Sequence, residues 1–127
     1  MFTTKMGLFC SCGRQGYYEC GGMMTPCSEQ TYRRYAEVAL CEGRHEIKEA
    51  EDGAIFGNTL DPRFPTLLYN EAEKVISESG VESLYVYVTG LSVALVAVIN
   101  ACHKLGVELT LYHYDRDTGK YIPQEVL

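Results

Sequence analysis

Residues 83–114, SLYVYVTGLSVALVAVINACHKLGVELTLYHY, predict one strand–helix–strand unit. Residues 84–88 are β-branched, aromatic or leucine without a polar interruption, which is typical of a strand buried on both faces. Residues 91–105 are too long for a strand and largely apolar, so we expect a mostly buried helix. Gly106 suits a helix C-cap, and the alternating residues 107–114 return as a strand. A crossover of this length joins parallel strands.

The segment upstream predicts a second unit of the same kind. Residues 54–57 form a short apolar strand, and residues 66–79 carry the apolar stripe of an amphipathic helix. Together with strand 84–88 they complete a strand–helix–strand unit, so two units in series predict a three-stranded parallel core. Residues 121–126 should then pair back as an antiparallel edge strand, where Pro123 is tolerated.

The N-terminal third of the chain has a different composition. Residues 1–27 are rich in Cys, Gly and Met, and their possible strands at 6–10 and 16–20 predict a hairpin. An apolar stripe within residues 28–43 predicts a helix. Residues 45–49 alternate weakly and predict an edge strand.

These elements predict a single domain of the α/β class. The chain has 127 residues and is 46% hydrophobic, which suits one globular core. We expect a small Rossmann-like core at residues 44–127 with a mostly parallel sheet, flanking helices and an antiparallel C-terminal edge strand. The Cys-rich hairpin of residues 1–27 would be added to it.

Charge and composition exclude several classes of function. The formal net charge of −6 argues against general affinity for duplex nucleic acid, which needs a basic face. No apolar run is long enough to span a bilayer, and the N-terminus lacks the pattern of a secretory signal. We therefore expect a cytoplasmic protein with reduced cysteines. The absence of GxGxxG and Walker A patterns argues against dinucleotide cofactors and nucleotide triphosphate hydrolysis, so no cofactor is expected.

Four cysteines, Cys10, Cys12, Cys20 and Cys27, fall in the N-terminal segment. Four thiolates could hold a tetrahedral zinc ion and make this segment a zinc-stabilised interaction module. Their spacing lacks paired C-x-x-C knuckles, which favours the alternative of small, reduced, buried residues. The sequence leaves the metal question open.

The expected parallel sheet indicates where a ligand would bind. Ligands of such sheets occupy the crevice beyond the carboxyl ends of the strands. The sequence places the following residues there: Asn58, Thr59, Asp61, Arg63, Thr89, Gly90, Ser92, His113, Asp115 and Arg116. The turn at Gly90 would direct N–H groups of the following helix toward an anion, and Arg63 could add contacts to a phosphate. His113 is either a general base or a hydrogen-bonded structural residue.

The segment YVYVTGLSVALVAVINAC, residues 85–102, resembles CARF-type Rossmann-like domains of CRISPR-associated and related anti-phage systems. That resemblance implies binding of a cyclic oligonucleotide at the carboxyl ends of the strands, often by a homodimer, and cleavage of the ligand in some members. Thr89, Gly90, Leu91 and Ser92 would correspond to the ligand-contacting turn.

The first expectation is therefore a small anionic, nucleotide-like ligand held by a homo-oligomer, with cleavage left open. The zinc-stabilised interaction module and an oligomer-forming structural protein without a small ligand are the alternatives.

Overall fold

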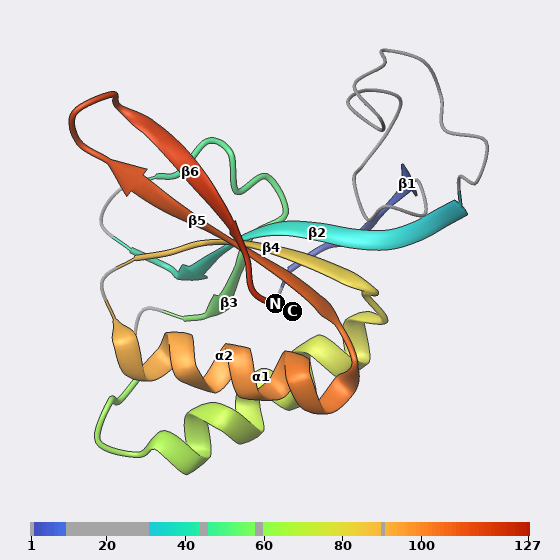
Figure 1. Ribbon diagram of the computed structural model, residues 1–127. Helices are drawn as coiled ribbons and strands as arrows, with labels where there is room; N and C mark the ends of the chain where they lie inside the picture. The colour runs from blue at the N-terminus through green and yellow to red at the C-terminus, as the bar shows by residue number, and fades with distance from the viewer. Residues whose placement is uncertain (1, 10–30, 44–45, 58–59, 90) are drawn as a thin grey trace.

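The computed structural model describes residues 2–9, 31–43, 46–57, 60–89 and 91–127 of the protein. They form an α/β fold in which α1 and α2 lie together on one face of a six-stranded mixed sheet (Figure 1). The elements in chain order are β1 (Lys5–Phe9), β2 (Thr31–Cys41), β3 (Ala54–Phe56), α1 (Pro65–Ser79), β4 (Ser83–Tyr87), α2 (Ser92–Leu105), β5 (Glu108–Asp115) and β6 (Lys120–Glu125).

The sheet runs in the order β1-β2-β4-β5-β6, with β3 also paired to β2. Strands β3, β2, β4 and β5 are mutually parallel, whereas β1 and β6 are antiparallel to their neighbours. β1 pairs with the first half of β2, and β3 pairs with its last residues. An antiparallel strand thus borders β5 on one side of the parallel set and the first half of β2 on the other.

The strand–helix–strand prediction for residues 83–114 is confirmed, because β4 and β5 are parallel neighbours joined by α2. Predictions for β3, α1 and the antiparallel β6 are confirmed as well. Both helices end at a glycine in the left-handed region, Gly80 at φ 72° and Gly106 at φ 70°. Glycine adopts this conformation without the clash that a Cβ would cause.

The predicted helix at residues 28–43 is wrong, because residues 31–41 form β2, the strand between β1 and β4. Ala36, Val38 and Leu40 are fully buried beneath the helices, and the alternate residues Tyr35 and Ala39 are also buried. A strand buried on both faces carries apolar residues at nearly every position, so a helical stripe can be read from it. Pairing with two neighbouring strands decides the conformation.

Other expectations also differ from the structure. Within the predicted edge strand 45–49, the described residues 46–49 lie in turns and irregular chain. The expected strand at 6–10 exists as β1, but its partner is β2, and the other half of the proposed hairpin lies outside the described residues. β3 and β4 are not neighbours, since β2 lies between them and makes the parallel set four strands rather than three. The sheet therefore begins well before residue 44.

The hydrophobic core fills the space between the sheet and the helix layer. Its helix residues include Leu68 and Ile76 of α1 and Val98 and Cys102 of α2, all at most 3% exposed. Burial raises the pKa of the Cys102 thiol to about 12, which keeps it neutral. Among the described helices, none is long and apolar enough to cross a membrane.

Truncation of a β2 core side chain should test the revised assignment. We expect Leu40→Ala to lower the free energy of unfolding by about 2–5 kcal/mol, because it removes a fully buried side chain and leaves a cavity. The matched control is Leu67→Ala on α1, where the leucine is 62% exposed and the loss should stay near 0.5 kcal/mol, about the range for surface positions. Urea unfolding followed by circular dichroism measures both. Equal losses would contradict the burial of β2.

Candidate functional site at the carboxyl ends of the strands

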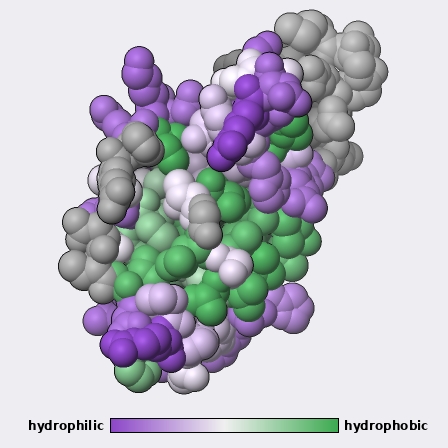
Figure 2. Space-filling view, turned by 90° about the vertical axis from the view of Figure 1, so that its left-hand side faces the viewer, coloured by the Kyte–Doolittle hydropathy of each residue, from purple (hydrophilic) through white to green (hydrophobic). Residues whose placement is uncertain are grey.

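The carboxyl ends of β3, β2, β4 and β5 meet at one edge of the sheet, because these strands are parallel. α2 also begins at this edge. Figure 2 looks onto it and shows hydrophobic side chains across the centre, with hydrophilic groups above and below. Partly buried apolar residues of this region include Leu60, Val88, Leu91 and Val93. The geometry suits a ligand with an apolar part and few polar contacts.

The turn between β4 and α2 brings Thr89, Leu91 and Ser92 together. The Leu91 N–H donates to the Thr89 carbonyl oxygen, with 2.5 Å between the nitrogen and the oxygen. Ser92 is the first residue of α2. Leu91 occupies the N-cap position, and no side chain of the described residues caps the helix. The first-turn N–H groups of α2 therefore lack an intrahelical or side-chain acceptor, as helix geometry requires. Gly90, the expected centre of this turn, lies outside the described residues.

Cys41 was not anticipated as part of the site. It ends β2, is half-buried, and its thiol hydrogen-bonds with the Thr89 side chain. Burial raises the pKa of this thiol, and the Thr89 hydrogen bond partly offsets the rise. A hollow of about 400 Å³ lies beside it, lined by Cys41, Glu42, Glu46, Ile47 and Gly53 among others. The incorrect helix assignment hid this residue, because only a strand ending at Cys41 delivers it to the edge.

Arg63 lies just before α1 and is paired with Asp61. Its Nε donates to both Asp61 carboxylate oxygens and its Nη2 donates to Oδ2, at 2.8–3.2 Å, and its guanidinium lies 5.7 Å from the Phe64 ring centre. The Arg63 side chain holds the pKa of Asp61 below its ordinary value. The charge that we expected to meet a phosphate is thus compensated within the loop. Asn58 and Thr59 lie outside the described residues.

His113 lies on β5 and forms a hydrogen bond across to β6. Its Nε2 lies 2.7 Å from the Gln124 Oε1. Because it alternates with Tyr112 and Tyr114, His113 faces the helix side of the sheet, whereas those two tyrosines face the other side. The contact is the kind expected of a hydrogen-bonded structural histidine, the second of the two roles considered for it.

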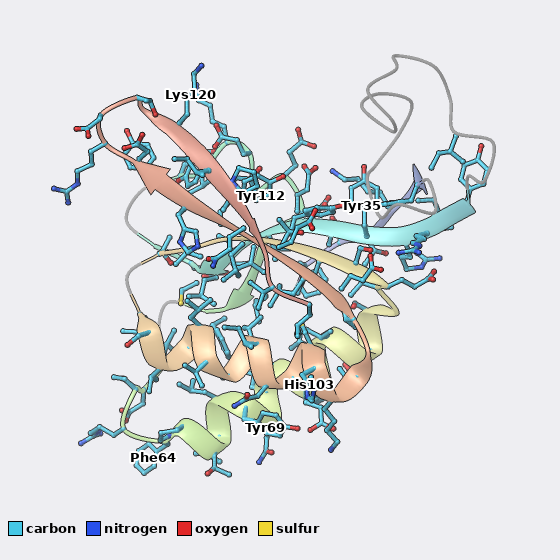
Figure 3. All side chains as sticks on the ribbon, in the orientation of Figure 1. Tyr35, Phe64, Tyr69, His103, Tyr112 and Lys120 are labelled. Atoms are coloured by element: carbon cyan, nitrogen blue, oxygen red, sulfur yellow. The ribbon has the colours of Figure 1, made fainter. Side chains whose placement is uncertain are left out.

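Tyrosines cover the side of the sheet turned away from the helices, a feature that was not predicted from the sequence. This tyrosine face carries Tyr35, Tyr85, Tyr87, Tyr112, Tyr114 and Tyr121. Figure 3 shows Tyr35 and Tyr112 on this side, with Phe64, Tyr69 and His103 in the helix layer. Tyr114 is 55% exposed, and the β4–β5 register places it one strand from Thr89. An exposed ring therefore lies at the same edge as the start of α2.

The cysteines considered for zinc, Cys10, Cys12, Cys20 and Cys27, lie outside the described residues. Within the part of the chain that the structure describes, no three His, Cys, Asp or Glu side chains are grouped to hold a metal. Zinc binding by these four cysteines therefore stays a prediction.

Thiol chemistry should report the Cys41–Thr89 contact. We expect Thr89→Val to raise the pKa of Cys41 further, because it removes the hydrogen bond that lowers it. At pH 8 the thiolate fraction falls, so iodoacetamide should modify Cys41 more slowly than in the unaltered protein. Peptide mapping by mass spectrometry separates Cys41 from the other cysteines. Thr66→Val, at an exposed position of α1, is the control and should leave the rate unchanged. Faster modification of Thr89→Val would contradict the contact.

No protein-family model, curated protein or solved structure matches this chain. The similarity of residues 85–102 to CARF-type domains therefore has no support from these comparisons.

Proposed function

We propose that the protein binds a small anionic, nucleotide-like ligand at the carboxyl edge of its parallel strands. The observation that carries this proposal is the uncapped start of α2, which opens at the edge where β3, β2, β4 and β5 end. In open parallel sheets this edge is the usual ligand crevice.

The phosphate would bind at the first turn of α2. Aligned peptide dipoles give a helix N-terminus a partial positive charge, and its free N–H groups donate to phosphate oxygens. Ser92 is exposed at this position and adds a hydroxyl. Arg116, exposed in the turn after β5, is a second source of positive charge near the edge.

The base would stack on an aromatic ring at the same edge. Tyr114 is more than half exposed and meets Tyr121 edge to face at 5.4 Å, which fixes its orientation. Stacking of a base on such a ring contributes about 1–3 kcal/mol and tolerates any base. The apolar residues Val88 and Leu91 would contact the remainder of the ligand.

The connections that leave the edge also favour a crevice. Figure 1 shows the segment that follows β2 on the tyrosine side of the sheet, whereas the turn that follows β4 enters α2 on the helix side. Neighbouring strands whose connections diverge in this way create the crevice at a topological switch point. We include in this proposal that the fold is related to Rossmann-like domains and that the ligand is bound as in CARF-type domains.

A proline at the first position of α2 should test it. Proline is favoured at a helix N1 position, and Leu91 already has the extended backbone that precedes proline, with φ −106° and ψ 95°. Ser92→Pro should therefore keep the fold and remove one N–H donor. Loss of a charged hydrogen bond of about 1.5–3 kcal/mol predicts affinity weakened roughly ten- to hundredfold. Calorimetric titration with adenosine mono- and diphosphate and with cyclic adenine oligonucleotides measures it.

The matched control is Ser92→Ala, which keeps the backbone donor and removes only the hydroxyl. We expect it to weaken binding far less than Ser92→Pro does. A shift in melting temperature with the same compounds provides an independent reading, because a ligand specific to the folded state stabilises it. Equal affinity of all three proteins, or no binding by any compound, would overturn the proposal.

A further inference from the structure

The tyrosine face forms a continuous aromatic surface across four strands. Ring centres lie 6.0 Å apart between Tyr35 and Tyr85, 6.3 Å between Tyr85 and Tyr112, and 4.7 Å between Tyr112 and Tyr87. Tyr121 follows at 4.9 Å from Tyr87. The rings contact each other edge to face, tilted or stacked, so each fixes the orientation of the next. Tyr35 and Tyr87 are buried within this array, whereas Tyr85, Tyr112 and Tyr121 are partly exposed and Tyr114 is exposed. The rings that a partner can reach are therefore held in place by the buried ones.

A hollow opens beside Tyr85 on this face. It encloses about 170 Å³ and is lined by Ser83, Tyr85, Glu108, Thr110 and Glu125 among others. This volume far exceeds the roughly 10–15 Å³ that one water needs, so the hollow can admit the end of a side chain. Burial raises the pKa of Tyr85, which keeps its hydroxyl protonated and its ring neutral. The hollow is thus lined by one ring, the hydroxyls of Ser83 and Thr110, and two carboxylates. The Ser83 hydroxyl donates to Glu108, which also pairs with Arg33, so Glu125 is the carboxylate available to a partner.

Carboxylates dominate the charge around these rings. Strand residues of this face and residues 46–53, which follow β2, together supply seven carboxylates against three cations. The carboxylates are Glu37, Glu46, Glu49, Glu51, Asp52, Glu108 and Glu125, and the cations are Lys5, Arg33 and Lys48.

Two of these cations are already neutralised inside the protein. Lys5 lies 3.2–3.4 Å from Glu37, Glu51 and Asp52, and Arg33 lies 2.7 Å from Glu108. Burial lowers the pKa of Lys5, but the surrounding carboxylates outweigh this effect and raise it overall, so it stays charged. Among the described residues, the carboxylates that are left without a cation give this face a negative electrostatic potential.

We propose that the tyrosine face docks a basic, extended polypeptide segment of a partner protein. Arginine and lysine heads bind over tyrosine rings by cation–π attraction and pair with nearby carboxylates. One such head would enter the hollow between Tyr85 and Glu125, and another would lie over Tyr112. Single-stranded nucleic acid, the other usual occupant of an aromatic sheet surface, needs a positive groove for its phosphates, and the carboxylates here oppose it.

The hollow that would receive the basic head is separate from the anion site proposed at the first turn of α2. α2 lies on the helix side of the sheet, whereas the hollow lies on the tyrosine side, toward the amino ends of β4 and β5. A nucleotide and a basic peptide should therefore bind independently.

The probe for this proposal is a short synthetic peptide of alternating arginine and serine, labelled for fluorescence anisotropy. We expect saturable binding that weakens as salt rises, and no binding of the matched peptide with glutamate in place of arginine. Tyr85→Leu should weaken binding roughly three- to thirtyfold, because the ring is lost. Glu125→Lys, at an exposed position, should weaken it about fivefold or more by charge reversal.

Glu78→Lys is the matched control, since Glu78 is exposed on α1 and the charge change is the same. It should leave the affinity unchanged. Binding that Glu78→Lys and Glu125→Lys weaken equally would overturn the proposal, as would absence of peptide binding. Preference for a single-stranded RNA oligonucleotide over the arginine peptide would assign the face to nucleic acid instead. Amide shifts in β4 and β5 on peptide addition locate the site even if Tyr85→Leu fails to fold.

Discussion

The fold depends on the hydrogen bonding of β2 at both of its edges. The connection from β3 through α1 to β4 skips one strand position, and β2 occupies it. An empty position would leave two rows of buried backbone N–H and C=O groups without partners, each at a cost of about 1–3 kcal/mol. β2 satisfies them and also receives β1 along its first half. The parallel edge that carries the candidate site exists only because this strand is in place.

The strand–helix–strand unit could be predicted from local pattern, and β2 could not. Residues 83–114 combine a short apolar run, a long apolar segment and a glycine that ends the helix, so each local signal agrees with the others. In β2, Tyr32, Tyr35, Val38 and Ala39 have helical spacing, although Ala36, Val38 and Leu40 also alternate. The conflict is resolved by pairing with β1 and β4, for example Lys5 with Tyr35. Such long-range pairings leave no local mark in the sequence.

The candidate site was predictable in position and less so in composition. Parallel strands imply a shared carboxyl edge, and the turn at Thr89 follows from glycine after a strand. Cys41 required the correct assignment of β2. The tyrosine face required the register of four strands, because a shift of one residue moves every side chain to the opposite face. The available sequence signal was the spacing of two residues between Tyr85 and Tyr87 and between Tyr112 and Tyr114. It shows that each pair shares a face, without showing that both pairs share the same one.

The ion pairs of the tyrosine face bear on its role more than on stability. Lys5 and its partners Glu37 and Glu51 keep 28–66% of their side-chain surface exposed, and pairs of this kind contribute at most about 1 kcal/mol each. Their stronger effect is to fix side chains around the aromatic surface and to leave carboxylates in excess there. On the helix side of the sheet, the dipole of α2 gives the carboxyl edge a partial positive charge. In the two proposals, one sheet thus separates the anion site at α2 from the hollow that would receive a cation, and the backbone of the strands holds the two in fixed relation.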